Sequence, residues 1–336
     1  MRNIVKKIFR NIRNFLDCFI IETQYKITNR NKPTPKLSSK NIMILVSRLY
    51  NGGAEKVAAI IANEISKKYN LVLVTIEDKN ENDYECTATR IVLKENQGKF
   101  LVKKNLVKQI RKIKEKYNIT HTISLCSKMN YFNVMSKVND VNIISIRNYL
   151  SVSVKEKKYQ HINKVSAKYA DKIIVVSKQL IEDQVKNFKA DKGKIHVIYN
   201  YIDEERIDEC LIDANIDKNE NSIINIGRLS YQKGQLNLIR AFKKVVMIIS
   251  NAKLYILGQG ELKEELEHEI KKLDLEKNVF MLGFQKNPYK FLKEANVFVL
   301  SSFYEGMSNA ILEAMYCGLP IISTDCKSRY KRNIGS

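Results

Sequence analysis

Residues 222–258 read SIINIGRLSYQKGQLNLIRAFKKVVMIISNAKLYILG and contain one complete unit of strand, helix and strand. The short runs at 222–227 and 252–258 are apolar and rich in β-branched or aromatic residues, which is typical of buried strands. Between them, residues 235–249 have the length and apolar spacing of a helix. A strand, a helix and another strand in this order predict two parallel strands of one sheet joined by a crossover helix.

The same alternation of strand and helix patterns extends along the whole chain. Further apolar runs of strand length occur at 41–47, 70–76, 120–125, 141–146, 171–177, 277–283, 296–301 and 319–324. A chain of 336 residues, 44% of them hydrophobic, is longer than a single core usually supports. We therefore predict an α/β protein of two tandem doubly wound, Rossmann-like domains, each built on a parallel sheet.

The domain boundaries follow from breaks in this pattern. The run KIHVIYN at 194–200 ends a strand and leads into polar chain, so we place the join near Asn200. Two prolines and no apolar periodicity indicate a linker at 32–40. The chain then divides into an extension at 1–31, the linker, a first domain at 41–200 and a second domain at 201–336.

The net charge of +22 lies entirely in the first part of the chain. Residues 1–200 hold 39 Lys and Arg against 17 Asp and Glu, an excess of 22, whereas residues 201–336 hold 19 of each. A basic half beside a neutral half indicates an anionic partner, either a nucleic acid or a membrane surface. A lysine-rich solubilising surface is the alternative explanation.

Residues 1–21 predict a basic amphipathic helix. Their apolar residues recur at helical spacing, opposite a stripe of cations that comprises Arg2, Lys6, Lys7, Arg10 and Arg13. Either this helix lies on an anionic membrane, which we favour, or it docks on the body of the protein. Residues 101–117 repeat the pattern, although their apolar face can equally pack on the sheet.

Membrane-spanning and disulfide-stabilised classes are both disfavoured. No apolar run approaches the roughly 18 to 20 residues that span a bilayer, and the N-terminus lacks the apolar core of a signal peptide. The six cysteines include no Cys-x-x-Cys pair, which argues against a disulfide framework and a zinc site. We expect a cytoplasmic protein that binds peripherally to the cytoplasmic face of a membrane.

Candidate site residues lie in the loops after the strands, because ligands of open α/β sheets bind beyond the carboxyl ends of the strands. Gly52 and Gly53 follow the first strand, where free backbone N–H groups can bind an anion or where glycine simply permits a tight turn. Arg228 and Lys233 precede a helix in the second domain and suit a diphosphate, unless they are only surface cations.

The most specific motif is SSFYEGMSNAILEAMYCGLP at 301–320, which places Glu305 on a loop after a strand and Glu313 in a short helix. These carboxylates form the E-x7-E pattern of retaining glycosyltransferases. They occur together with GRL and KG in the second domain, VIYN at the join and GG after the first strand. Over residues 40–328 the sequence resembles the family-four glycosyltransferases (glycosyl transferases group 1) of the GT-B fold.

The resemblance implies a donor site for a nucleotide-sugar. By it, Glu313 bonds the ribose hydroxyls, and Glu305 holds the sugar and phosphates together with the backbone of Gly306, Met307 and Ser308. Gly52 and Gly53 would also face the donor, and the loop at 284–287 would meet the base.

Catalysis would fall to Arg228, Lys233 and Glu305, because the two cations neutralise the diphosphate as the glycosidic bond breaks. No metal ion or other cofactor is expected. Retention would proceed by front-face displacement, with the leaving phosphate acting as the base.

The first domain of such enzymes binds the acceptor, and Arg147 and Asn148 lie at a strand end where they can face it. His121 begins its strand at the opposite edge and is interpreted as structural. The resemblance therefore predicts a retaining, metal-independent hexosyltransferase that acts on a lipid-linked or polysaccharide acceptor. Its products would be cell-surface glycans such as capsule or lipopolysaccharide.

Three other interpretations account for parts of the sequence. A glycoside hydrolase also uses two carboxylates, but the nearby Arg and Lys would depress the pKa of its general acid. A nucleic-acid-binding protein fits the charge, but the sequence has neither a recognition-helix pattern nor an aromatic stacking platform, so we expect no nucleic acid partner.

The third interpretation comes from the C-terminal residues, because the resemblance stops at DCKSRYKRNIGS, residues 325–336. We therefore expect an incomplete second domain, with an inert nucleotide-binding remnant as the alternative function.

Overall fold

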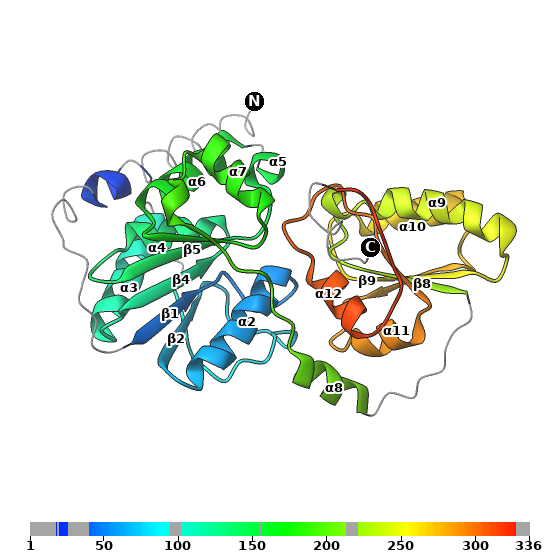
Figure 1. Ribbon diagram of the computed structural model, residues 1–336, viewed down its shortest axis with the longest axis horizontal. Helices are drawn as coiled ribbons and strands as arrows, with labels where there is room; N and C mark the ends of the chain where they lie inside the picture. The colour runs from blue at the N-terminus through cyan, green and yellow to red at the C-terminus, as the bar shows by residue number, and fades with distance from the viewer. Residues whose placement is uncertain are drawn as a thin grey trace. The chain divides into compact units, whose positions relative to one another are not determined.

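A computed structural model of the protein describes residues 18, 20–25, 40–94, 102–154, 156–212 and 221–326 (Figure 1). The chain divides into two compact units. The described residues up to 50 and those from 54 to 198 form the first unit, and residues 51–53 with the described residues from 199 onward form the second. The crossing between Ile198 and Tyr199 lies close to the predicted join at Asn200.

The first unit contains a seven-stranded sheet in the order β3-β2-β1-β4-β5-β6-β7. Every neighbouring pair of strands is parallel. Parallel sheets covered on both faces use nearly continuous apolar strands, which is the pattern seen in the sequence. The strands are β1 Asn41–Leu45, β2 Asn70–Thr75, β3 Thr89–Val92, β4 His121–Leu125, β5 Val141–Ile146, β6 Lys172–Val175 and β7 Ile195–Val197.

Helices cover both faces of this sheet (Figure 1). On one face α3 packs on α4, α4 on α6 and α6 on α7, while α2 lies on the other face. The helices are α2 Gly53–Ser66, α3 Val102–Lys116, α4 Ser127–Met135, α5 Leu150–Ser153, α6 Lys157–Tyr169 and α7 Gln179–Phe188. In α3 the buried side chains include Leu106, Val107 and Ile110, so the apolar face of this second amphipathic pattern packs inside the domain.

The described end of the predicted N-terminal helix docks on the first unit. Residues 20–25 are helical, and Cys18, Ile21 and Tyr25 are buried. The Tyr25 ring lies 4.8 Å from that of Tyr169 in α6, and the hydroxyl of Tyr131 in α4 donates to Glu22 Oε1 at 3.4 Å. The described residues 18 and 20–25 therefore dock on the body of the protein, which was the alternative to membrane binding. Residues 1–17 and 19, which carry the predicted cationic stripe, lie outside the described residues.

The second unit contains a five-stranded parallel sheet in the order β10-β9-β8-β11-β12. Its strands are β8 Ser222–Ile226, β9 Lys253–Leu257, β10 Val279–Gly283, β11 Val297–Leu300 and β12 Ile321–Ser323. Its helices are α8 Glu204–Ile212, α9 Gln235–Ile248, α10 Lys263–Lys272, α11 Tyr289–Glu294 and α12 Asn309–Tyr316. The strand order reverses between β8 and β11, and ligands of such sheets bind at this reversal.

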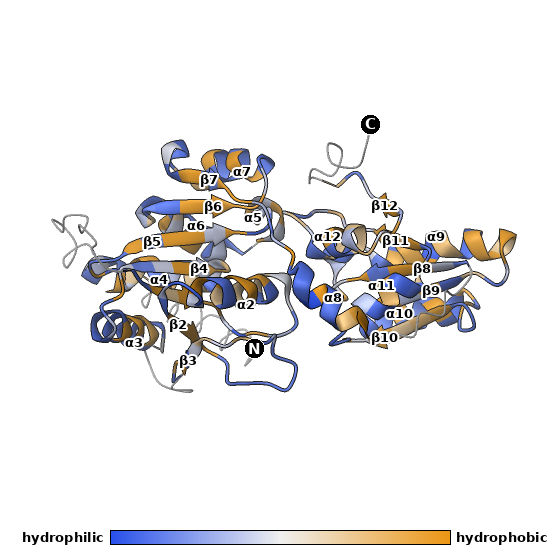
Figure 2. Cartoon of the chain, turned by 60° about the horizontal axis from the view of Figure 1, so that its bottom comes forward, coloured by the Kyte–Doolittle hydropathy of each residue, from blue (hydrophilic) through white to orange (hydrophobic). Residues whose placement is uncertain are grey.

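Each face of the second sheet has its own apolar core. One core packs α8, α11 and α12 against residues such as Ile224 and Phe298, and the other packs α9 and α10 against residues such as Leu254 and Val299. Figure 2 shows apolar residues concentrated on the strands, with helices that are apolar on one side and polar on the other. This amphipathic pattern is what buried helix faces require.

The structure confirms the predicted architecture of two doubly wound α/β domains. All ten runs identified as strands form strands, and the strand end identified at 194–200 is β7. The structure adds the short edge strand β3, which was not predicted. Residues 32–39 of the linker predicted at 32–40 lie outside the described residues, as do residues 327–336, where the resemblance stops. Among the helices that are described, none combines the length and apolar composition needed to cross a bilayer.

Candidate functional site

The loops that follow β8 and β11 hold a buried carboxylate in a network of three side-chain donors. Lys233 Nζ lies 2.6 Å from Glu305 Oε1, and Ser302 Oγ donates to the same oxygen at 2.8 Å. Gln232 Nε2 donates to Glu305 Oε2 at 3.4 Å. Glu305 is only 5% exposed, so the network fixes its orientation in the loop and compensates its charge.

Gly234 allows these two loops to lie against each other. Its φ is 64°, and a Cβ added there would meet the Ser301 carbonyl oxygen at 2.2 Å. Ser301 Oγ donates to the Lys233 carbonyl at 2.8 Å, and the Phe303 backbone N–H donates to the Gln232 carbonyl at 2.8 Å. The glycine of the KG motif is therefore required for the backbone contact that brings Lys233 to Glu305.

Arg228 occupies a loop that two further glycines bring close to the end of β9. A Cβ at Gly258 would meet the Gly227 carbonyl at 2.0 Å, and one at Gly260 would meet the Leu229 carbonyl at 2.1 Å. The Arg228 side chain is exposed. Burial raises the pKa of the Tyr304 hydroxyl, and the positive charge of Arg228 opposes that rise. Arg228 thus adds positive potential beside the β11–α12 loop.

The helix α12 carries the second carboxylate. Glu313 lies in the second turn of α12 and is 5% exposed, and Glu305 lies on the preceding loop, as the sequence predicted. Ser308 occupies the N-cap position with an extended backbone, and Gly318, at φ 79°, follows the end of the helix. Gly306, Met307 and Ser308 therefore lead directly into a helix N-terminus, where backbone N–H groups can bind an anion.

The predicted base-binding loop at 284–287 connects β10 to α11 and is held by its own side chains. Gln285 Nε2 donates to the Leu282 carbonyl at 2.6 Å, and Asn287 Nδ2 donates to the Cys210 carbonyl at 2.8 Å. These bonds give the loop a fixed backbone course. Its role in binding a base stays a prediction.

The predicted residues of the first domain lie on other loops. Gly52 and Gly53 stand where β1 leads into α2, and the structure groups residues 51–53 with the second unit although the sequence placed them in the first domain. Arg147 and Asn148 directly follow β5, and burial lowers the pKa of Arg147 to about 10, an effect that Glu55 opposes. Their roles toward donor and acceptor stay predictions. His121 begins β4 at the opposite, amino edge of the sheet, as expected of a structural residue.

Several site features were not predicted. Gln232 and Ser302 lie inside the motifs GRLSYQKG and SSFYEG, where spacing alone did not distinguish them from ordinary loop residues. Tyr231 and Phe303 form an exposed stack, with ring centroids 4.8 Å apart, beside the Lys233 loop. Asn200, in the VIYN motif at the join, bonds the turn before α12. All of these features depend on contacts between loops that are far apart in sequence, which is why local patterns did not predict them.

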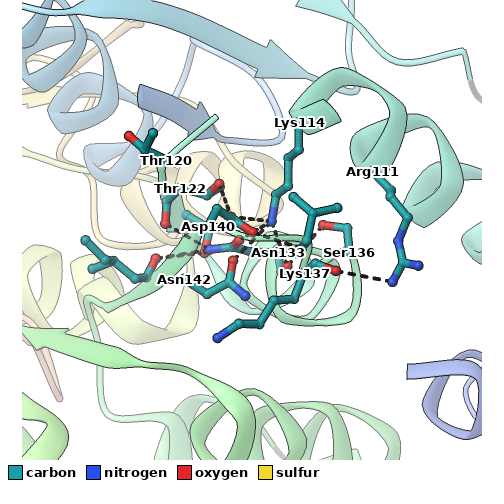
Figure 3. Close-up of polar contacts among 12 residues, drawn as sticks. Arg111, Lys114, Thr120, Thr122, Asn133, Ser136, Lys137, Asp140 and Asn142 are labelled. Carbon is teal, nitrogen blue, oxygen red and sulfur yellow. Dashed lines mark hydrogen bonds and ion pairs between the residues drawn. The ribbon is translucent and has the colours of Figure 1, made fainter. Parts of the chain in front are cut away.

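A second polar cluster lies in the first unit, and we assign it to the stability of the fold and not to ligand binding (Figure 3). Lys114 Nζ, fully buried, lies 2.8 Å from Asp140 Oδ2 and donates to the side-chain oxygens of Asn133 and Asn142 at 3.1 and 3.0 Å. Burial alone would raise the pKa of Asp140, but Lys114 and the donors Thr122 and Val138 outweigh burial and lower it. The cluster lies near the amino ends of β4 and β5, away from the ligand edge.

The described residues contain no group of three or more His, Cys, Asp or Glu placed to hold a metal ion.

Two family models together match residues 51–333 of the chain. The sequence model described as "Glycosyltransferase Family 4" matches residues 51–206, and that described as "Glycosyl transferases group 1" matches residues 207–333. An uncharacterized glycosyltransferase of Methanocaldococcus jannaschii is 41% identical over 241 residues, which cover 66% of this chain and 59% of that protein. The match thus spans less than two thirds of that relative's length.

Two further similarities are more extensive. The N-acetylgalactosamine-N,N'-diacetylbacillosaminyl-diphospho-undecaprenol 4-alpha-N-acetylgalactosaminyltransferase of Campylobacter jejuni is 32% identical over 308 residues, which cover 87% of this chain and 82% of that protein. The crystal structure of Anabaena Alr3699/HepE in complex with UDP and glucose superposes with a TM-score of 0.71 at 18% identity, and the match covers 85% of this chain and 81% of that one.

Proposed function

Because the chain belongs to the family 4 (group 1) glycosyltransferases, we propose that it transfers a sugar from a nucleotide-sugar donor to a lipid-linked or polysaccharide acceptor. The observation that carries the proposal is the ion pair between Lys233 and Glu305, 2.6 Å apart, at the start of the loop that leads into α12. The loops of the two family motifs, 72 residues apart in sequence, meet at this pair. The Campylobacter relative and the UDP complex of the Anabaena protein support the donor and acceptor classes.

The donor would lie along the carboxyl edge of the second sheet. In this arrangement Glu313 accepts hydrogen bonds from the ribose hydroxyls, and the backbone N–H groups of residues 306–308 bind the phosphates at the N-terminus of α12. Glu305 would accept from sugar hydroxyls with its orientation already set by Ser302, Gln232 and Lys233. The loop at 284–287 would contact the base.

The chemical step we propose retains the anomeric configuration. The acceptor hydroxyl oxygen bonds the anomeric carbon from the same face as the departing diphosphate, whose bond to that carbon breaks. The acceptor proton passes to the leaving phosphate oxygen. Arg228 and Lys233 would stabilise the charge that develops on the diphosphate, so no metal ion is required for this role.

The acceptor would bind to the first unit, at the strand ends where Arg147 and Asn148 follow β5. By its name, the Campylobacter relative acts on an acceptor linked to diphospho-undecaprenol. The basic excess of residues 1–200 suits an anionic membrane, so we place the enzyme peripherally on the cytoplasmic face.

A turnover screen tests the proposal. The 336-residue protein is incubated with UDP-, GDP- and dTDP-sugars, with and without EDTA, and release of the free nucleoside diphosphate is followed. We expect release from one donor class, unaffected by EDTA and reduced in Lys233→Ala. Absence of turnover with every donor, or release that Lys233→Ala leaves unchanged, would contradict the assignment.

A further inference from the structure

Asn200 lies just inside the second unit, two residues after the crossing from the first. Its side-chain amide donates to the Met307 carbonyl at 3.2 Å and to Asn309 Oδ1 at 2.6 Å. Its backbone N–H points to Met307 Sδ at 3.3 Å. These contacts span more than one hundred positions of sequence and join the crossing segment to the turn that precedes α12.

The two acceptors of the amide flank one residue, Ser308, which is 4% exposed. Met307 is the residue before it, and Asn309 is the first residue of α12. Because one planar amide group bonds the Met307 carbonyl and the Asn309 side chain, it restrains the residues on both sides of Ser308 and, through them, the direction in which the first N–H groups of α12 point. Holding these groups in place in advance lowers the cost of ordering them when an anion binds.

We propose that Asn200 is a positioning residue that holds the turn at 306–309 in its phosphate-binding shape and couples that turn to the crossing segment. The inference rests on the proposed function, because it takes this turn as the donor-phosphate site. Donor binding and the conformation of residues 198–200 then influence each other: a crossing segment that moves away releases the turn, and a bound donor favours the segment position in which Asn200 reaches it.

The chemistry of the position favours an amide. Both partners of Asn200 Nδ2 are oxygen acceptors, so a carboxylate at this position would have no hydrogen to offer and would face two electronegative atoms. Asn200→Asp should therefore disturb the turn at least as much as Asn200→Ala, although Asp has the same shape as Asn. A residue that served only to fill space would not distinguish the two variants in this way.

The experiment measures the affinity of UDP, GDP and dTDP by calorimetry, at a temperature where circular dichroism shows every variant folded. For the nucleotide that the wild type binds, Asn200→Ala should weaken binding about three- to tenfold, as expected for a lost neutral hydrogen bond, and Asn200→Asp at least as much. In steady-state assays, KM for the donor should rise more than kcat falls. In a double-mutant cycle with Asn309→Ala, the combined loss should be smaller than the product of the single losses.

Asn296→Ala is the matched control. Asn296 Oδ1 accepts from the Ser222 backbone N–H at 2.8 Å near the amino end of β11, so its removal costs comparable bonds at the opposite edge of the same sheet. This variant should melt earlier and bind nucleotide as the wild type does. If Asn200→Ala and Asn200→Asp also keep wild-type affinity and lose only thermal stability, the inference is wrong while the proposed function stands. If the wild type binds none of the three nucleotides, the proposed function fails and takes the inference with it.

Discussion

The buried ion pair of the first unit offers the clearest test of the packing described above. Replacing Lys114 by Met keeps most of the side-chain volume but removes the ammonium group that lies 2.8 Å from Asp140. Among the described residues, Asp140 then keeps the Thr122 hydroxyl and the Val138 backbone N–H as hydrogen-bond donors, and the side-chain oxygens of Asn133 and Asn142 lose the donor that Lys114 supplied. Breaking a fully buried pair in this way costs about 3–5 kcal/mol. We expect Lys114→Met to destabilise the first unit by that amount.

The assay must report on the first unit alone, because a chain of two units need not unfold in one step. Hydrogen exchange in increasing urea, read by mass spectrometry on peptides from α3 and β5, gives the free energy of unfolding of this region. Lys137→Met is the matched control, since Lys137 pairs with Asp171 at 2.6 Å but both side chains are partly exposed, at 20% and 30%. That variant should lose no more than about 1 kcal/mol. Equal losses in the two variants would show that burial of the Lys114–Asp140 pair does not increase its contribution to stability.

The pH dependence provides a second check on the same pair. In the wild type the folded pKa of Asp140 is lowered, so its contribution is present above the unfolded pKa of about 3.9 and is lost as pH falls through the folded value. In Lys114→Met, burial without the cation raises the folded pKa, so protonation at acid pH relieves the buried charge. The stability difference between the two proteins should therefore shrink from pH 7 to pH 4. A constant or growing difference would contradict the ion-pair account.

Three other predictions concern the site and the membrane. Lys233→Ala should lower turnover about 10- to 150-fold, which corresponds to the loss of a charge-assisted contact, and Arg228→Ala should also lower turnover more than binding. Steady-state kinetics check both variants, and unchanged turnover would exclude these residues from the mechanism. Gly234→Ala should lower the melting temperature and abolish turnover, because its Cβ would lie 2.2 Å from the Ser301 carbonyl at a left-handed φ; a fully active, equally stable variant would show that the loop contact is dispensable. Deleting residues 1–17 should reduce co-sedimentation with anionic vesicles and leave co-sedimentation with neutral vesicles unchanged, because each cation near the surface contributes about 1 kcal/mol of binding free energy. Unchanged co-sedimentation with anionic vesicles would exclude a membrane role for this segment.

Much of the fold could be predicted from local patterns. The ten apolar runs identified as strands needed no knowledge of their partners, because a strand covered on both faces is apolar along its length. The strand β3, Thr89–Val92, was missed because it is short, partly exposed and begins with polar residues at the sheet edge. The alternation of elements was enough to predict the architecture.

Contacts between distant segments could not be predicted in the same way. Lys114 lies in a stretch with many lysines and looks like another solvated cation, yet it is fully buried because Asp140, Asn133 and Asn142 converge on it. Likewise, the motifs identified Lys233 and Glu305 separately, but their pairing depends on how two loops pack. For the helix predicted at 1–21 we favoured a membrane over docking on the protein, because the pattern of an amphipathic face suits either surface; the described residues 18 and 20–25 dock on the first unit.

Calorimetric titration of UDP, GDP and dTDP shows whether the second unit binds a nucleotide-sugar through the E-x7-E motif, as we propose. The wild type should bind one of these nucleotides, and Glu313→Ala should weaken that binding roughly tenfold to a hundredfold, because a buried carboxylate that accepts from the ribose hydroxyls is lost. Glu276→Ala, which removes an exposed carboxylate between α10 and β10, is the control and should leave the affinity unchanged. Nucleotide binding that survives Glu313→Ala at full strength, or no binding by the wild type, would contradict the account.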